Sequence, residues 1–197
     1  MRREGGTVTE NCEGGWVFWC RKLMGWLKPD FWCESLDCVP LEKLWNDGVR
    51  LLFVDLDNTL TEAGGEWVSE PICAWIEKAK AKGFTIIVVS NALGPVRVSR
   101  VSEQLGVVGI PLAAKPRRFA FLRCLQILGY HPSQAAMIGD QLFTDILGGK
   151  RAGLKTILIK PLGKRVLSGQ IQASFERLIV VLMRRYGGEN PGESREL

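Results

Sequence analysis

Two aspartates one residue apart, Asp55 and Asp57, directly follow four apolar residues and precede a short polar turn. The apolar run, residues 51–54, is typical of a strand buried on both faces of a sheet. Because a strand projects residues i and i+2 to the same side, we expect the two carboxylates to converge just beyond its end. Two acids that close repel each other unless a cation or a shared proton lies between them. The pair therefore indicates a reactive or metal-binding site.

Further polar residues stand directly after other apolar runs of the chain. They are Ser90 with Asn91, then Lys115, then Asp140 with Asp145. In open parallel sheets, ligands bind beyond the carboxyl ends of the strands. Carboxylates suit Mg²⁺, a lysine neutralises phosphate charge, and a serine hydroxyl donates to a phosphate oxygen. This set predicts a site for a phosphate group and one hard divalent cation.

The apolar runs alternate with segments of helical periodicity, and the connections between them are short. We expect strands at residues 51–54, 85–90, 107–112, 135–138 and 156–159. We expect helices at residues 40–47, 69–83, 95–105 and 117–128, and one that begins at residue 143. Alternating strands and helices imply right-handed crossovers and a parallel sheet. The predicted fold class is therefore α/β, a doubly wound, Rossmann-like parallel sheet flanked by helices.

Local signals set the ends and faces of three of these helices. Ser69 is a plausible N-cap, and Gly83 ends that helix. Ile72, Trp75, Ile76 and Ala79 form one apolar face of this helix, and the spacing of Phe121, Leu122, Leu125 and Leu128 indicates another helix. The helix that begins at residue 143 is expected to close at Gly148-Gly149.

Outside the predicted domain, residues 27–186, lie two segments of different composition. Residues 1–26 are rich in Trp, Cys and Gly, and the apolar residues from Trp16 to Leu27 have roughly helical spacing. Such a segment fits a helix at a membrane interface, a peripheral helix packed on the domain, or a flexible tail. Residues 170–186 are predicted as a terminal helix, and the Gly, Glu and Pro-rich tail 187–197 as disordered.

Charge is unevenly distributed along the chain. Residues 1–114 carry 12 basic and 15 acidic residues, whereas residues 115–197 carry 14 and 6, a net of +8. A basic half suits an anionic partner such as a phosphate ester, an acidic lipid surface or a nucleic acid. No apolar run reaches the ~20 residues of a membrane-spanning helix, and the N-terminus lacks the apolar core of a secretion signal. We therefore expect a cytoplasmic protein.

The six cysteines do not form a metal-binding pattern. None of them makes a CxxC pair, and His131 is the only histidine. Free thiols of a cytosolic protein are therefore the better interpretation than a zinc or cluster site.

Four segments together resemble the ordered motifs of the haloacid dehalogenase (HAD) phosphatase superfamily. They are Asp55-Leu56-Asp57-Asn58-Thr59, Ser90-Asn91, Lys115-Pro116 and residues 139–145, Gly-Asp-Gln-Leu-Phe-Thr-Asp. All four occur in order, each at the end of a predicted strand. A wider similarity, over residues 25–186, is to the YqeG-type, subfamily IIIA phosphatases, relatives of the phosphatidylglycerophosphate phosphatases of mitochondria and plastids. Ala92 departs from the polar residue expected there, and residues 1–24 have no counterpart.

The resemblance implies an aspartyl-phosphate mechanism with Mg²⁺ as cofactor. Asp55 is the implied nucleophile, and Asp57 the implied general acid and base, whose backbone carbonyl also binds the metal. Ser90 and Lys115 would hold the phosphoryl oxygens, with Asn91 also on the substrate side. Asp140 is an implied metal ligand. Asp145 is a second ligand, a partner that orients the site, or an ordinary acid in the first turn of a helix.

The spacing of the motifs leaves no room for a cap domain, the insertion with which many of these enzymes enclose small substrates. An uncapped site suits a bulky or surface-bound substrate, or must be covered by another subunit. The leading expectation is Mg²⁺-dependent dephosphorylation of phosphatidylglycerophosphate, an anionic phospholipid, at the inner membrane surface. The alternatives are a phosphatase of soluble sugar, nucleotide or nucleic-acid-end phosphates, and a non-catalytic protein that binds the membrane surface. A nucleic acid is not the expected partner, and the oligomeric state has no signature in the sequence.

Overall fold

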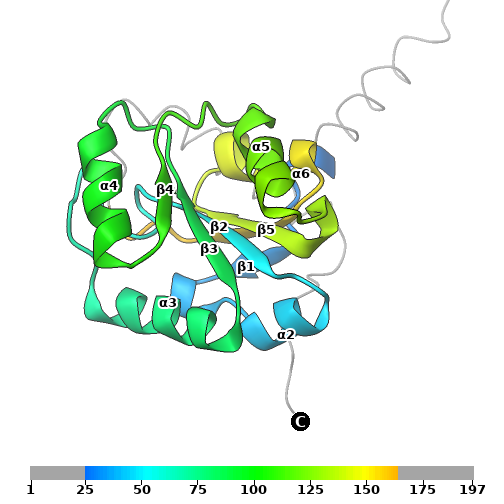
Figure 1. Cartoon of the computed structure of the whole chain (residues 1–197), viewed down its shortest axis with the longest axis horizontal. Helices are drawn as coiled ribbons and strands as arrows, with labels where there is room; N and C mark the ends of the chain where they lie inside the picture. Colours follow the sequence, from blue (N-terminus) through cyan, green and yellow to red (C-terminus); the bar gives the residue numbers. More distant parts are fainter. Residues whose placement is uncertain (1–24, 164–197) are drawn as a thin grey trace, which may run out of the picture.

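In the computed structural model, which describes residues 25–163, one parallel sheet lies between layers of helices (Figure 1). The sheet order is β1-β6-β5-β2-β3-β4. The strands are β1 (Phe31–Cys33), β2 (Leu51–Asp55), β3 (Thr85–Val89), β4 (Val108–Ile110), β5 (Ala135–Gly139) and β6 (Lys155–Ile159). The α-helices are α2 (Leu41–Asn46), α3 (Glu70–Lys82), α4 (Pro95–Gln104), α5 (Phe119–Leu128) and α6 (Leu147–Ala152). Single turns η1 (Leu36–Cys38) and η2 (Pro132–Gln134) and a π-helical turn η3 (Leu142–Ile146) complete the fold. The predicted doubly wound α/β class is confirmed.

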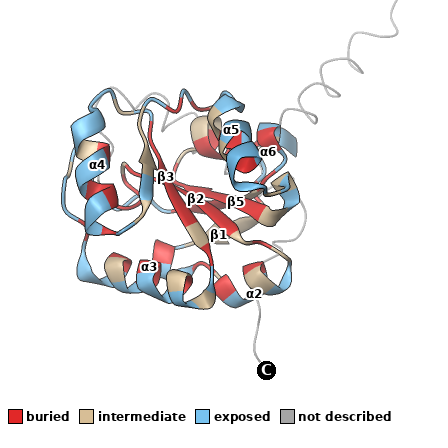
Figure 2. Cartoon of the chain, viewed as in Figure 1, coloured by how far each residue is buried: buried red, intermediate tan, exposed pale blue. Residues whose placement is uncertain are grey.

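The central strand β2 is buried along its whole length, which is why its sequence is an unbroken apolar run. Its side chains alternate between two cores. Leu52 and Val54 pack in the cluster that includes residues of α2, α3 and α4, whereas Leu51 and Phe53 pack with α5 and α6. Figure 2 shows the buried central strands and the exposed outer sides of the helices. Asp55 ends the strand on the same side as Phe53.

The chain reverses its direction of travel across the sheet at β2. β3 and β4 follow on one side of β2, and β5 and β6 follow on the other, so β2 and β5 are paired neighbours although far apart in sequence. Ligand sites of doubly wound sheets lie at such a switch point, beyond the carboxyl ends of the strands. The fold therefore places the ends of β2 and β5 where a site is expected.

Neither of the two described intervals between the motifs holds an inserted domain. Only a loop, α3 and β3 separate Asp57 from Ser90, and only α4 and β4 lie between Asn91 and Lys115. The prediction that neither interval holds a cap domain is confirmed.

Helix α3 follows its sequence signals closely. Ser69 is the N-cap residue, although its side chain makes no capping hydrogen bond, and Gly83 ends the helix with φ +102°, a conformation that favours glycine. Its buried residues are the predicted ones, Ile72, Trp75, Ile76 and Ala79.

The expected stop at Gly148-Gly149 is wrong, because both glycines lie within α6 and the helix ends at Gly153. They serve close packing instead. A Cβ on Gly149 would lie 2.8 Å from Thr156 Cγ2, and one on Gly148 would lie 3.2 Å from Phe121 Cε2. These glycines therefore let α6 approach both β6 and α5.

Helix α5 is confirmed, although its bounds are shorter than expected at the N-terminus. Phe121 and Leu125 are buried, whereas Leu122 and Leu128 are 37% and 43% exposed, because only one narrow side of this helix faces the sheet. The strand expected at residues 107–112 shrinks to Val108–Ile110, since the chain leaves the sheet before Leu112, which has φ +52°.

Strand β1, which pairs in parallel with β6 at the sheet edge, was not predicted from the sequence. Asp30, just before it, fixes this pairing. Its carboxylate accepts hydrogen bonds from the Thr156 backbone N–H at 2.8 Å and the Thr156 hydroxyl at 3.0 Å, and pairs with Lys150 at 2.6 Å.

The tryptophan-rich residues 1–24, the expected terminal helix 170–186 and the expected disordered tail 187–197 lie outside the described residues. Among residues 25–163, no helix has both the length and the apolar character that crossing a bilayer requires.

Candidate active site

Three buried aspartates meet at the switch point of the sheet. Asp55 ends β2, Asp140 directly follows β5, and Asp145 lies in η3. One carboxylate oxygen of each lies within 4.8 Å of the others. All three residues are buried, with exposed fractions of 5% or less. Oxygen atoms gathered in this way are the ligand set that a hard divalent cation prefers.

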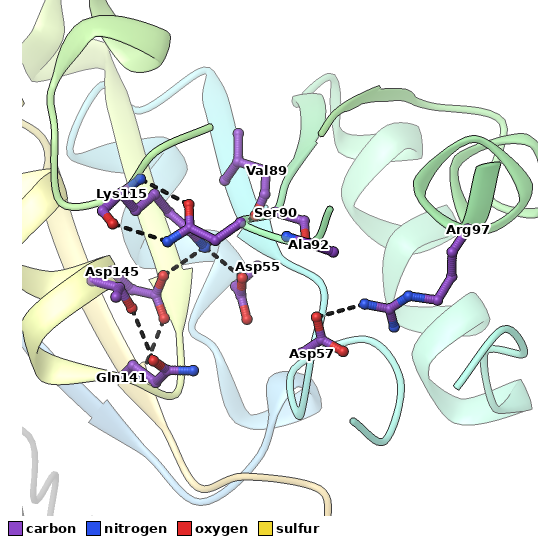
Figure 3. A network of polar contacts seen from close by, with 11 residues as sticks. Asp55, Asp57, Val89, Ser90, Ala92, Arg97, Lys115, Gln141 and Asp145 are labelled. Atoms are coloured by element: carbon purple, nitrogen blue, oxygen red, sulfur yellow. Dashed lines mark hydrogen bonds and ion pairs between the residues drawn. The ribbon is translucent and has the colours of Figure 1, made fainter. Parts of the chain in front are cut away.

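Lys115 reaches the same point from the loop after β4 (Figure 3). Its ammonium group contacts Asp55 Oδ1, lies 2.7 Å from Asp145 Oδ1, and donates to the Val89 carbonyl at 3.0 Å. Burial alone would lower the pKa of Lys115, but the charges of Asp145 and Asp55 outweigh it and raise the pKa. Lys115 therefore stays cationic in the interior.

One cation does not neutralise three buried acids. Burial raises the pKa of Asp55 to about 7, with Lys115 opposing the rise and Asp145 adding to it. The second oxygen of this carboxylate, Oδ2, is buried and has no hydrogen-bond partner among the described residues. An unpaired buried acceptor beside other acids fits a divalent cation, which would supply both the missing partner and the missing charge.

Asp145 is held in place from two sides. Its Oδ1 lies against Lys115, and its Oδ2 accepts the backbone N–H of Gln141 at 3.1 Å. These contacts fix the orientation of the Asp145 carboxylate beside Asp55 and Asp140, and its role as a second metal ligand or as an orienting partner stays a prediction.

Gly139, the last residue of β5, makes room for Asp145. A Cβ built on it would lie 2.3 Å from Asp145 Oδ2 and 2.7 Å from Asp145 Cβ, closer than real atoms approach. We expect Gly139→Ala to displace Asp145, to lower the free energy of unfolding by about 1–3 kcal/mol, and to weaken divalent-cation binding in a calorimetric titration.

Gly94→Ala is the matched control, because a Cβ there meets nothing within 4 Å. Unchanged cation affinity in Gly139→Ala would contradict the proposed role of this glycine.

The expected convergence of Asp57 with Asp55 is wrong for the carboxylates in this structure. Strand β2 ends at Asp55, so the two-residue alternation no longer applies, and the chain turns through Asn58, whose φ is +60°. The Asp57 carboxylate points away from the cluster and pairs with Arg97 Nη2 at 2.6 Å (Figure 3). Its Oδ1 also accepts the Gly64 backbone N–H at 3.0 Å.

Arg97, in the first turn of α4, is the site residue that the sequence reasoning missed. Besides Asp57 it binds the Gly65 carbonyl at 3.1 Å, so it fixes both ends of the loop that follows the strand. The sequence did hold a signal, because Arg97 and Arg100 are three residues apart and so lie on one side of α4. In the structure both contact the segment 57–66.

We expect Arg97→Gln to destabilise the protein at neutral pH by about 1 kcal/mol, which is the usual contribution of a partly exposed ion pair. Burial raises the pKa of Asp57, but the hydrogen bonds from Arg97 and Gly64 outweigh it and hold the pKa below its ordinary value of 3.8. A carboxyl group with a depressed pKa stabilises the fold at pH values above its ordinary pKa, and this stabilisation is lost as the pH falls below it. The difference in melting temperature between wild type and variant should therefore shrink on acidification.

Arg100→Gln serves as the control, because its pair with Glu66 is far more exposed and should contribute little. Equal losses in the two variants, or a difference that persists at low pH, would contradict this account of Asp57.

The two residues after β3 have distinct surroundings. Ser90 is buried and its Oγ accepts the Ala92 backbone N–H at 3.0 Å, which leaves the hydroxyl proton available to donate. The Asn91 side chain instead binds the Lys115 backbone twice, accepting from its N–H at 2.8 Å and donating to its carbonyl at 2.9 Å. In this structure Asn91 therefore positions Lys115, whereas a direct contact with substrate stays a prediction.

Comparison with known proteins gives the chain a family. Residues 112–164 match the family model Hydrolase_like, described as HAD-hydrolase-like. The chain is 34% identical to "Probable phosphatase YqeG" of Bacillus subtilis over 160 residues, which is 81% of this chain and 92% of that protein. It is 28% identical to "Phosphatidylglycerophosphate phosphatase 1, chloroplastic/mitochondrial" of Arabidopsis thaliana over 78% of this chain, but spans only 46% of that longer protein.

A solved structure gives a weaker likeness. The cobalt-bound deoxy-D-mannose-octulosonate 8-phosphate phosphatase of Haemophilus influenzae aligns with a TM-score of 0.49 at 19% identity, over 74% of this chain and 92% of that one. This likeness is too distant to bear on function. The YqeG similarity is stronger, because it covers nearly the whole of that relative at 34% identity. The chain belongs to the HAD superfamily, in the branch of the YqeG-type phosphatases.

Proposed function

We propose that this chain is a Mg²⁺-dependent phosphomonoester hydrolase that forms an aspartyl-phosphate on Asp55. The observation that carries the proposal is the buried contact of Asp55 with Lys115 at the switch point, beside Asp140 and Asp145. A carboxylate in this position is next to a fixed positive charge that can bind a phosphoryl group.

In the first half-reaction, a carboxylate oxygen of Asp55 attacks phosphorus and the bond from phosphorus to the ester oxygen breaks. Asp57 donates its proton to the leaving oxygen. Since Asp57 pairs with Arg97 here, this step requires the carboxyl group to release Arg97 and take up a proton. Lys115 and the Ser90 hydroxyl hold the phosphoryl oxygens during the transfer.

In the second half-reaction, the Asp57 carboxylate takes a proton from water while the water oxygen attacks phosphorus. The bond from phosphorus to Asp55 breaks, inorganic phosphate leaves, and Asp55 is restored. Asp57 can act as this base because it became a carboxylate again when it gave its proton to the leaving oxygen.

Asp55, Asp140 and the backbone carbonyl of Asp57 would hold the cation, with Asp145 orienting the site through Lys115 and Gln141. Bound Mg²⁺ supplies neutralisation of the negative charge that collects on the transferred phosphoryl group.

We further propose that the substrate is phosphatidylglycerophosphate, which loses its terminal phosphate to give phosphatidylglycerol. Three observations support this choice. The Arabidopsis relative carries that activity in its name, no cap domain encloses the site, and the second half of the chain is strongly basic, which suits an anionic lipid surface.

Phosphate release from phosphatidylglycerophosphate in detergent micelles, measured beside soluble sugar and nucleotide phosphates, tests the proposal. We expect release from the lipid with Mg²⁺ and its loss with a chelator. Hydrolysis of a soluble ester without hydrolysis of the lipid would overturn the substrate, and the absence of release from either would overturn the phosphatase proposal itself.

A further inference from the structure

Two loops lie side by side along the carboxyl edge of the sheet, above the proposed site. One joins β3 to α4 and the other joins β4 to α5 (Figure 1). Backbone and side-chain hydrogen bonds tie them together: Ala113 N–H donates to the Ser90 carbonyl at 2.9 Å, and Asn91 binds the Lys115 backbone twice. Side chains that project from these loops therefore belong to one surface.

That surface carries large apolar side chains in contact with water. Leu93 is 86% exposed, Phe119 76%, Val96 63% and Leu112 56%. We refer to these four residues as the apolar rim. Single exposed apolar residues are ordinary on protein surfaces. Several of them on two linked loops and the first turns of the helices that follow, beside a site, are typical of a binding surface.

Leu112 is the most informative member of the rim. Its φ of +52° lies in the left-handed region, where glycine or asparagine is sterically favoured over leucine. Burial does not compensate, because more than half of the side chain is exposed. Neither backbone conformation nor core packing accounts for a leucine here, so contact with an external apolar phase is the better explanation.

The chain segment that carries Leu112 and Phe119 has charges of one sign. Between Glu103 and Asp140 the chain has no acidic residue, whereas Arg117, Arg118 and Arg123 are all exposed. Arg117 and Arg118 directly precede Phe119 of the rim. Apolar side chains next to arginines match the interface of a bilayer that contains anionic lipids, where the side chains enter the acyl boundary and the cations meet the headgroups.

We propose that the apolar rim, with Arg117 and Arg118, docks the protein on an anionic lipid bilayer so that the carboxyl edge of the sheet faces the headgroups. The inference rests on the proposed lipid substrate, and it explains how an uncapped site meets a phosphate fixed at a membrane surface. The few basic residues beside the rim are attracted to anionic lipid by a modest amount each, which supports reversible binding rather than permanent insertion.

Co-sedimentation of the full chain with vesicles tests the proposal. Vesicles of equal parts phosphatidylcholine and phosphatidylglycerol should bind the wild type, and vesicles of phosphatidylcholine alone should bind it far less. The double variant Leu93→Ser/Phe119→Ser should lose about tenfold or more in partition to the anionic vesicles. Arg117→Gln/Arg118→Gln should lose binding at moderate salt and differ least from wild type at high salt.

Matched controls come from exposed residues elsewhere. Val108→Ser/Ile127→Ser removes apolar side chains of 64% and 67% exposure away from the rim, and Lys43→Gln/Lys78→Gln removes two exposed charges from α2 and α3. Both controls should bind like wild type. The rim variant should hydrolyse a soluble ester at the wild-type rate, because neither Leu93 nor Phe119 is among the residues assigned to the catalytic site.

Binding by the rim variant equal to wild type, equal losses in the controls, or wild-type binding that ignores lipid charge would each overturn the docking proposal. A rim variant that shifts the oligomeric mass without changing vesicle binding would do so too, since it would identify a contact between copies of the chain. The lipid substrate fails separately: a wild type that binds vesicles through the rim but hydrolyses only soluble esters keeps the docking surface and loses the substrate. Hydrolysis of micellar lipid without vesicle binding would keep the proposed substrate and overturn the docking surface.

Discussion

Asp55→Asn is expected to abolish phosphate release, by a factor on the order of 10⁴ or more, while the fold survives. The amide nitrogen and oxygen cannot form the aspartyl-phosphate, so the first half-reaction has no nucleophile. The fold should tolerate the change, because an amide oxygen still accepts from Lys115 and one buried negative charge is removed. Phosphate release and thermal unfolding, measured on the same preparation, check both parts.

Asp37→Asn, an exposed change in η1, is the control and should retain full activity. Substantial turnover by a folded Asp55→Asn protein would sink the nucleophile assignment. A variant that is inactive because it is unfolded would show no cooperative melting transition.

Lys115→Met is expected to be the most destabilising single change at the site. Removing the cation leaves Asp55 and Asp145 buried without their shared partner, a loss of about 3–5 kcal/mol when one member of a buried ionic network is deleted. The melting temperature should fall sharply and phosphate release should disappear, because Lys115 also holds the transferred group. Chemical denaturation and activity assays measure the two effects.

The comparison that isolates the charge effect is a double variant. Lys115→Met/Asp145→Asn should regain part of the lost stability, since one stranded carboxylate is neutralised, but should regain no activity. Lys155→Met, which breaks a half-exposed pair with Asp47, should cost much less. Stability lost equally in Lys115→Met and Lys155→Met would contradict the buried network.

The parts of the fold that the sequence could predict are those in which local chemistry and burial agree. Residues 51–54 form an unbroken apolar run because β2 is covered on both faces, and α3 has its cap, its apolar face and its terminal glycine in the expected places. The carboxyl ends of parallel strands lie at one edge of a sheet, so the proximity of Asp55, Lys115 and Asp140 could be predicted from the sequence.

What the sequence could not supply depends on distances between elements. Gly148 and Gly149 have the composition of a helix end, and only the closeness of Thr156 and Phe121 reveals them as packing residues. The direction of Asp57 depends on the turn through Asn58 and on Arg97, which is 40 residues further along the chain. Strand β1 is three residues long and exists only because β6 offers it an edge.

The charged cluster also has a consequence for how the chain folds. Lys115 comes from the side of the sheet built by β3 and β4, whereas Asp145 follows β5 on the opposite side of β2. Without the β3 and β4 side, Asp55 and Asp145 would both be buried without their counter-charge, a state of high free energy. The two halves should therefore assemble in one late cooperative step, and during refolding catalytic activity should return together with protection of the slowest-exchanging amides of β2.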